Sequence, residues 1–177
     1  MSRKVILYLA VSLDGYIADA DGQVAWLDAA CPEQSTPSSY DQFIALIDTV
    51  IMGRRTYDQI ITELSPERWP YCGLTSYVLT HHPDVDQPSI FFRSQPLSTL
   101  LQTLRQQPGR DIWLCGGADL VQQARAQNLI DRYYLTVMPV LLGQGLPLFQ
   151  SGLAPTALSL QACWHEGALV NLIYDRL

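Results

Sequence analysis

The chain has 177 residues, of which 48% are hydrophobic and 16% charged, and its formal net charge is −6. This length and composition allow a substantial core that needs no disulfide or metal, so we expect a single domain over residues 1–177. The sparse, net negative charge argues against nucleic-acid binding. No apolar run approaches the roughly 20 residues of a membrane span, so we expect a cytoplasmic protein that binds neither nucleic acid nor membrane.

The first half of the chain alternates buried strands with helical patterns. A continuous apolar run at 5–11 predicts a buried strand, and a loop rich in Gly, Asp and Ala follows through residue 27. A helix comes next, and its apolar positions, spaced i, i+3, i+4 and i+7, are Tyr40, Phe43, Ile44 and Ile47. A second buried strand is expected at 49–52 and a short helix at 55–61.

The middle of the chain repeats this alternation, and the last third changes to strands alone. Strands are expected at 77–80, 90–93 and 112–115. One helix carries Leu97, Leu100, Leu101 and Leu104 before the stop signal Pro108-Gly109, and another runs through about residue 127. The final strands are expected at 133–142, 158–164 and 168–174, with a hairpin turn at 165–167. This order predicts an α/β fold with a mixed sheet and helices on both sides.

Two segments share the order of a buried strand, a glycine turn and a helix start. One leads through Gly53 into Arg54 and Arg55, and the other leads through Gly116 and Gly117. Unpaired N–H groups and the positive dipole end make a helix N-terminus a seat for phosphate, and glycine lets the backbone approach closely. Two such turns on adjacent strands could hold both ends of one dinucleotide, although Gly-Gly is also common in plain turns. The paired arginines favour a bound anion, because cations oppose the dipole at a helix start.

These motifs resemble the dihydrofolate reductase superfamily, and within it the C-terminal reductase domain of the bifunctional riboflavin-biosynthesis deaminase–reductase. Four segments carry the resemblance: Ala-Val-Ser-Leu-Asp-Gly-Tyr-Ile-Ala at 10–18, Met-Gly-Arg-Arg-Thr-Tyr at 52–57, Cys-Gly-Gly-Ala at 115–118 and Pro-Val-Leu-Leu-Gly-Gln-Gly-Leu-Pro-Leu-Phe at 139–149. The last segment favours the riboflavin branch over true dihydrofolate reductases. The resemblance implies a dihydrofolate-reductase-like, three-layer α/β/α fold with antiparallel C-terminal strands, and NADPH as cofactor.

The resemblance also implies which residues hold NADPH. Ala10 and Ile17 match positions that pack on the nicotinamide ring. The turn that binds the 2′-phosphate and the pyrophosphate corresponds to Gly53, Arg54, Arg55 and Thr56, with Arg54 as the 2′-phosphate cation. The double glycine, with an expected cis peptide, and the helix start facing the pyrophosphate correspond to Gly116, Gly117, Ala118 and Leu120. A second 2′-phosphate contact corresponds to Thr80 and His81, where serine or arginine is more usual than histidine.

The substrate side offers several candidates. Asp14, at the end of the first strand, is the candidate catalytic proton donor, and a plain Asp-Gly turn is the alternative. Asp28 is the candidate carboxylate for the substrate ring, and because the segment 26–37 lacks a clean family match, two other acids stay open: Glu33 and Asp41. Tyr8 and Trp26 could flank a flat ring, and Tyr8 could equally pack in the core.

The reaction that the resemblance implies is hydride transfer from NADPH to a carbon–nitrogen double bond or a ring-opened sugar imine. We therefore expect a reductase of a pyrimidine- or pterin-like substrate, similar to the 5-amino-6-(5-phosphoribosylamino)uracil reductase of riboflavin biosynthesis. Dihydrofolate reduction is an alternative within the same class. A non-catalytic nucleotide-binding module and a purely structural domain are alternatives from other classes.

The cysteines predict neither a metal site nor a disulfide framework, because they are widely spaced without a CxxC pair: Cys31, Cys72, Cys115 and Cys163. Cys115 and Cys163 lie in apolar runs and are expected to be buried thiols. The segment 139–149 carries too many apolar residues for an exposed loop, which predicts a homodimer. The resemblance implies the same, since this region contributes to dimers in the riboflavin branch.

Overall fold

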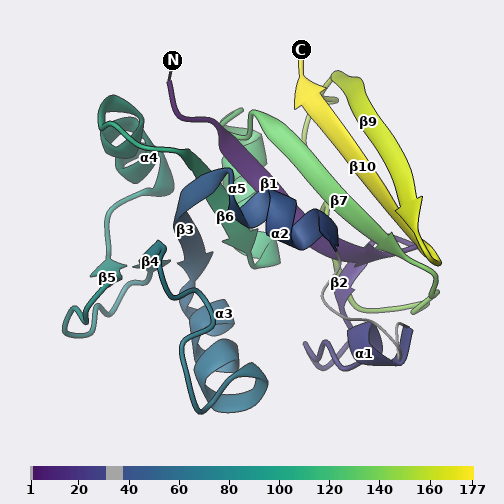
Figure 1. Cartoon of the computed structure of the whole chain (residues 1–177), viewed down its shortest axis with the longest axis horizontal. Helices are drawn as coiled ribbons and strands as arrows, with labels where there is room; N and C mark the ends of the chain where they lie inside the picture. Colours follow the sequence, from purple (N-terminus) through teal and green to yellow (C-terminus); the bar gives the residue numbers. More distant parts are fainter. Residues whose placement is uncertain (1, 31–37) are drawn as a thin grey trace.

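The computed structural model describes residues 2–30 and 38–177, and its centre is an eight-stranded sheet with helices on both faces (Figure 1). The strands are β1 (Val5–Ser12), β3 (Ile47–Gly53), β4 (Thr75–Leu79), β5 (Ile90–Arg93), β6 (Asp111–Gly116), β7 (Arg132–Met138), β9 (Leu158–Glu166) and β10 (Leu169–Arg176). They lie in the order β5-β4-β3-β6-β1-β7-β10-β9, parallel from β5 to β7, with β10 antiparallel to both of its neighbours. The predicted mixed, mostly parallel sheet is confirmed.

The helices form a layer on each face of the sheet. One layer holds α4 (Leu97–Gln106) and α5 (Ala118–Ala126), and the other holds α2 (Ser38–Ile44) and α3 (Arg54–Gln59), which continues as a π-helical segment η1 (Ile60–Leu64). The short helix α1 (Trp26–Ala30) comes before α2 in the chain. Among residues 2–30 and 38–177, no helix has both the length and the apolar character needed to cross a bilayer.

Alternation along β1 divides the core into two halves. Val5 and Leu7 pack with the four leucines of α4, while Ile6 packs with the aromatic residues of α2 and α3, and all three side chains are at most 1% exposed. Successive side chains of a strand point to opposite faces, so an apolar run without alternation fills both core halves. The expected three-layer α/β/α arrangement follows from this pattern and is confirmed.

Several element boundaries differ from the prediction, and three of the differences have a clear physical reason. The helix expected to include Ile47 ends at Ile44, because Ile47 is fully buried as the first residue of β3, opposite Asp111 of β6. The strand expected at 133–142 ends at Met138, because Pro139 has no N–H to donate to the sheet. The predicted turn also shifts, since Glu166 still pairs with Leu169 and only residues 167–168 form the hairpin loop.

A second, two-stranded sheet occupies segments for which no strand pairing was predicted. β2 (Tyr16–Ala18) pairs antiparallel with β8 (Leu146–Pro147), and the Leu148 amide donates to the Gly15 carbonyl at 2.9 Å. Gly145 has a φ of +152°, and a Cβ there would lie 2.2 Å from the carbonyl oxygen of Ala18, so the close approach of these strands requires glycine. The segment 139–149 is therefore folded back onto the end of β1, with Leu148 buried in the core.

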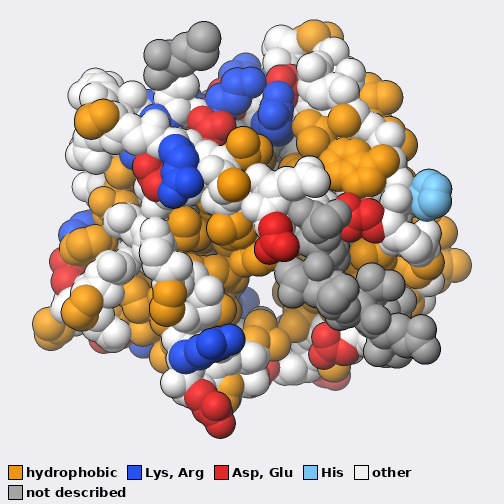
Figure 2. All heavy atoms as spheres, in the orientation of Figure 1, with side chains coloured by type: hydrophobic (Ala, Val, Ile, Leu, Met, Phe, Trp, Pro, Cys, Tyr) orange, Lys and Arg blue, Asp and Glu red, His pale blue; other side chains and the backbone are white. Residues whose placement is uncertain are grey.

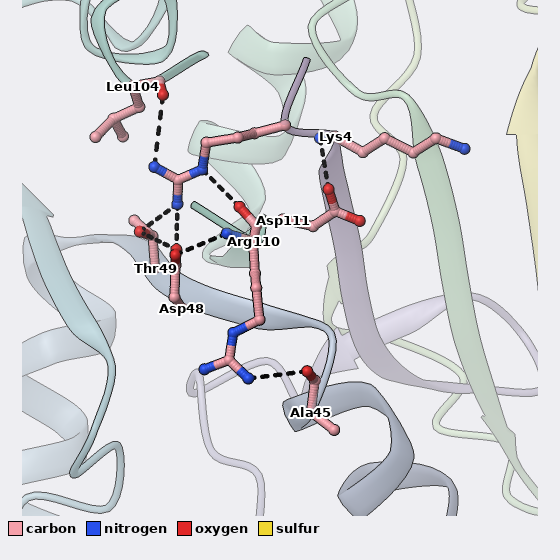
Figure 3. Close-up of polar contacts among 8 residues, drawn as sticks. Lys4, Ala45, Asp48, Thr49, Leu104, Arg110 and Asp111 are labelled. Carbon is pink, nitrogen blue, oxygen red and sulfur yellow. Dashed lines mark hydrogen bonds and ion pairs between the residues drawn. The ribbon is translucent and has the colours of Figure 1, made fainter. Parts of the chain in front are cut away.

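A buried arginine ties together the amino ends of the central strands (Figure 3). Arg3 is 6% exposed; its guanidinium pairs with Asp48 and donates to the Thr49 hydroxyl at 2.6 Å and to the Arg110 carbonyl at 2.5 Å. Asp48 also accepts from the Arg110 amide at 2.8 Å. This network joins the start of β1 to β3 and to the loop before β6, so it fixes the register of three strands at one edge.

We expect Arg3→Met to lower the free energy of unfolding by about 2–4 kcal/mol, because Asp48, Thr49 and the Arg110 carbonyl would lose the buried guanidinium that joins them. Urea unfolding measures the change. Lys4→Met is the matched control: Lys4 is half-exposed and lies 3.5 Å from Asp175, so its loss should cost less than about 0.5 kcal/mol. Equal losses in the two variants would contradict the role assigned to Arg3.

Candidate functional site

The two glycine turns predicted from the sequence meet at the carboxyl edge of the sheet. β3 and β6 are parallel neighbours, and Met52 pairs with Gly116, so Gly53, the last residue of β3, and Gly117, the first residue after β6, both lie at this edge. A Cβ added at Gly117 would lie 3.4 Å from the Thr56 hydroxyl oxygen. The peptide bond that joins the two glycines of the second turn is cis, as expected. The adjacency of the two turns is therefore confirmed.

The helix starts at these turns leave N–H groups available to a ligand. Gly53 caps α3 and Gly117 caps α5, and neither start has a side-chain cap. The Gly117 carbonyl accepts from the amides of Leu120 and Val121 at 3.0 and 3.1 Å, whereas the amides before them have no acceptor within the helix. Leu120 was expected at the cofactor, but its side chain is buried in the core and its amide is already bonded. The edge favours negative charge through the remaining amides, including that of Ala118, and through the helix dipole.

The two arginines at the start of α3 have different surroundings. Arg54 donates from Nε to both carboxylate oxygens of Asp58, at 2.7 and 2.9 Å, and from Nη1 to Asp84 at 2.6 Å. The hydrogen bond and charge of Asp58, followed by the charge of Asp84, raise the pKa of Arg54. Arg55 is exposed and forms no ion pair within the described part of the chain. Among the described residues, Arg55 is therefore a cation at this edge whose charge no ion-paired carboxylate compensates.

The strand next to β3 brings a third segment to the same edge. β4 ends at Leu79, which pairs with Gly53, and Thr80 and His81 follow directly. The Thr80 amide donates to the Arg93 carbonyl at 2.9 Å, and its hydroxyl accepts from the His82 amide at 3.2 Å. The His81 side chain is exposed. Both residues thus lie where a ligand in contact with α3 could reach them.

The two residues expected at the nicotinamide ring, Ala10 and Ile17, lie on different strands. Ala10 is half-buried near the carboxyl end of β1, on the same face as Tyr8. Ile17 lies on β2 and packs against the core beneath α4 and α5. Tyr8 itself stacks on Phe43 of α2, with ring centroids 4.1 Å apart and planes at 9°, and burial raises its pKa. Tyr8 is thus part of the aromatic core under α2.

The carboxylate of Asp14 is hydrogen-bonded within the protein. Its carboxylate accepts from the Ser12 hydroxyl at 2.6 Å and from the amides of Leu142 and Gly143 at 3.1 and 2.7 Å. The hydrogen bond from Ser12, supported by the two amides, lowers the pKa of Asp14. A carboxyl group in this state is an acceptor at neutral pH, so the geometry favours the turn alternative over proton donation.

The other substrate candidates are scattered. Trp26 opens α1, its Nε1 is buried without a hydrogen-bond partner among the described residues, and no ring contact in the described part joins it to Tyr8. Asp28 is exposed in the first turn of α1, and Asp41 is exposed in α2. Glu33 lies outside the described residues. The two described acids, Asp28 and Asp41, thus lie on different helices.

Sequence reasoning missed a buried polar row on the α2 face of the sheet. Ala10, Thr136 and Asn171 are neighbours across β1, β7 and β10. The Thr136 hydroxyl donates to the Asn171 side-chain oxygen at 2.8 Å, and the fully buried Asn171 has a side-chain N–H group without a partner among the described residues. Close by, the Ser39 hydroxyl of α2 donates to Glu166 at 3.2 Å. The sequence pattern that could have predicted this row is a single polar residue inside each of two apolar strands, Thr136 in β7 and Asn171 in β10.

The surface is hollowed between the α3 side and the α1 side, below α2, where the carboxyl ends of the central strands lead (Figure 2). Two further shallow hollows, of about 310 and 360 Å³, lie at the opposite edge around Ser2 and Arg105. There Arg105 pairs with Asp131 at 2.5 Å, so charges at that edge serve the fold. Among the described residues, the carboxyl edge instead combines free amides, a cation without an ion pair and a polar row, an arrangement that favours negative charge beside polar groups.

Comparisons with known proteins give the family of the chain. The family model of the RibD C-terminal domain matches residues 3–170. The uncharacterised protein YwjB of Bacillus subtilis strain 168 is 40% identical over 177 residues, which cover 99% of both chains.

Solved structures extend the comparison to the fold. A proposed riboflavin biosynthesis protein from Shewanella sp. PV-4 has a TM-score of 0.86 and 27% identity, with 100% of this chain and 99% of that chain covered. Dihydrofolate reductase from Enterococcus faecalis, complexed with NADP(H) and RAB-propyl, has a TM-score of 0.64 and 15% identity, with 99% of each chain covered. The chain therefore belongs to the RibD C-terminal domain family, on a fold that it shares with dihydrofolate reductase.

Proposed function

We propose that the chain is an NADPH-dependent reductase of a pyrimidine- or pterin-like ring, similar in reaction to 5-amino-6-(5-phosphoribosylamino)uracil reductase. The observation that carries the proposal is the meeting of two uncapped helix starts at one sheet edge, beside Arg55, in a member of this family. Two neighbouring helix starts can hold both ends of a dinucleotide, whereas a turn that only reverses the chain does not require an uncapped helix start beside it.

The residues at the edge fit the diphosphate of a nicotinamide dinucleotide. The first amides of α5 and the charge of Arg55 match a group with two negative charges. Glycine at position 117 keeps space open beside Thr56, because any side chain there would begin 3.4 Å from the Thr56 hydroxyl oxygen. These residues would hold the cofactor's phosphates in place of water.

On the substrate side, the protein's task is to orient the ring and exclude water. A bound nicotinamide would supply the hydride. Ala10 is small and half-buried, and Thr136 and Asn171 lie beside it across the sheet, so a polar ring over Ala10 would lie next to this polar row. The aromatic core around Tyr8 and Phe43 lies on the same face of the sheet and excludes water beside this row. Asp14 is assigned a positioning role, since it holds the turn at 142–143 against the end of β1.

The direct test is titration of the purified protein with NADPH, followed by tryptophan quenching and nicotinamide fluorescence. NADPH oxidation is then measured with aminouracil ribosyl phosphates, pterins and dihydrofolate. Binding together with turnover of an aminouracil supports the proposal, and turnover of dihydrofolate at ordinary enzyme rates favours that alternative instead. Binding without turnover of any of these compounds favours a nucleotide-binding module.

Arg55→Ala should weaken binding of NADPH and NADH alike by about tenfold, because one charge-assisted contact to the shared diphosphate is lost. Fluorescence titration gives both dissociation constants. Arg68→Ala is the matched control, since Arg68 is an exposed arginine in the loop beyond η1 and should change neither constant by more than about twofold. Equal effects of the two substitutions would show a general charge effect and contradict a diphosphate contact.

Asp14→Asn should speed hydrogen exchange at the amides of Leu142 and Gly143 at neutral pH, because a neutral amide is a weaker acceptor than a carboxylate. Folding lowers the pKa of Asp14, so in the unmodified chain this protection is complete above the unfolded-state pKa of about 4 and is lost as the pH falls through the lower folded-state value. Asp21→Asn, an exposed acid in the next turn, is the control. Unchanged exchange combined with abolished turnover would assign Asp14 a role on the substrate.

We also propose that the chain forms a homodimer through the uncovered face of β9 and β10. No helix covers these strands on the α4–α5 side in the part of the chain that the structure describes (Figure 1). The side chains there, which we call the outer patch, are Leu158, Leu160, Cys163, Val170, Leu172 and Tyr174. Leu160 is 55% and Val170 38% exposed, and Cys163, expected to be buried, is exposed as well. Such a patch favours association.

Leu160→Glu should convert the dimer to a monomer at micromolar concentration, because two copies of a charged group would be buried against apolar surface. Light scattering during size-exclusion chromatography measures the mass. Leu64→Glu, which changes an exposed leucine of η1, is the control and should leave the dimer intact. A monomeric unmodified protein, or a dimer in both variants, would contradict this interface.

A further inference from the structure

Arg54, the residue that the family resemblance assigns to the cofactor's 2′-phosphate, already has two anionic partners. Asp58, one helical turn along α3, accepts from Nε, and Asp84, from the segment after β4, accepts from Nη1 at 2.6 Å. The guanidinium carbon also lies 5.9 Å from the ring centroids of both Tyr57 and Phe92. The Arg54 guanidinium is therefore positioned by two carboxylates and two aromatic rings of the protein itself.

The charge at this corner differs from that of a simple phosphate site. Arg54 contributes one positive charge, and Asp58 and Asp84 contribute two negative charges, so the cluster carries a formal charge of −1. A phosphate monoester brings nearly two further negative charges. Because the three side chains are between 37% and 53% exposed, water screens these charges only in part. A dinucleotide without the 2′-phosphate places no additional negative charge beside this cluster.

The two carboxylates are not equivalent. Asp58 is on the same helix as Arg54 and forms an ordinary i,i+4 pair with Nε. Asp84 reaches Arg54 from thirty residues away and takes a terminal guanidinium nitrogen, which is the kind of donor that phosphate oxygens use. Asp84 therefore occupies one of the two terminal nitrogens of Arg54 that a 2′-phosphate could use.

We propose that Asp84 is a cofactor-specificity residue that competes with the 2′-phosphate for Arg54 and so narrows the preference of this chain for NADPH over NADH. This inference rests on the proposed nicotinamide dinucleotide site. The 2′-phosphate must displace Asp84 or bind beside it, and either arrangement reduces the gain from the contact with Arg54. NADH, which has a hydroxyl at this position, binds with the Arg54–Asp84 pair in place.

The test is Asp84→Asn, with Asp86→Asn as the matched control. Asp86 lies two residues away, is similarly exposed, and pairs with Arg93 at 2.9 Å, so its substitution changes net charge equally without touching Arg54. Fluorescence titrations with NADPH and NADH are combined with displacement of NADH by adenosine 2′,5′-bisphosphate and by AMP, which isolate the adenosine corner. These are binding measurements and do not depend on turnover.

Asp84→Asn should tighten NADPH and adenosine 2′,5′-bisphosphate binding by about three- to tenfold, leaving NADH and AMP within about twofold, and the gain should shrink at high ionic strength. Asp86→Asn should leave the NADPH-to-NADH ratio unchanged. An unchanged ratio in Asp84→Asn, or equal shifts in both variants, overturns the role of Asp84 while the dinucleotide site stands. Failure of the unmodified protein to bind either dinucleotide overturns both proposals.

Discussion

Burial of β1 on both faces is the constraint on which the rest of the structure depends. Ile6 and Leu7 lie on opposite faces and are each at most 1% exposed, so the strand needs a packing layer on both sides. It also needs a partner on each edge, and β6 and β7 supply them in parallel. Parallel neighbours end at the same edge, which gathers their following turns. The candidate site is thus a consequence of how β1 is buried.

Local pairing, rather than net charge, decides where this acidic chain can attract an anion. Within the described part of the chain, seven of the eleven lysines and arginines form an ion pair with an aspartate: Arg3 with Asp48, Lys4 with Asp175, Arg54 with Asp58 and Asp84, Arg93 with Asp86, Arg105 with Asp131, Arg132 with Asp175, and Arg176 with Asp131. Arg55 has no such partner in the described part of the chain, and it stands at a helix start where the dipole also favours anions. A chain with net charge −6 can therefore retain one electropositive edge.

The features predictable from the sequence are those encoded over a few residues. The leucine stripe of α4 and the two glycine turns depend on local spacing, and the structure contains them where expected. The pairing of β2 with β8 joins Tyr16 to Pro147, and no local pattern contains that information. The contact between Arg54 and Asp84 and the buried pair of Thr136 with Asn171 likewise depend on which strands become neighbours. Exposure of Cys163 depends on β9 being the edge strand without a helix above it.

The position of β1 in the sheet also determines the order in which the molecule can assemble. β1 is made before its two partners, β6, which begins at Asp111, and β7, which begins at Arg132, so its edges stay unpaired until those strands have been made. Pairings so distant along the chain require closure of long loops, which slows folding and leaves apolar surface exposed in the meantime. Nascent chains of this protein should consequently depend on chaperones until β7 has emerged.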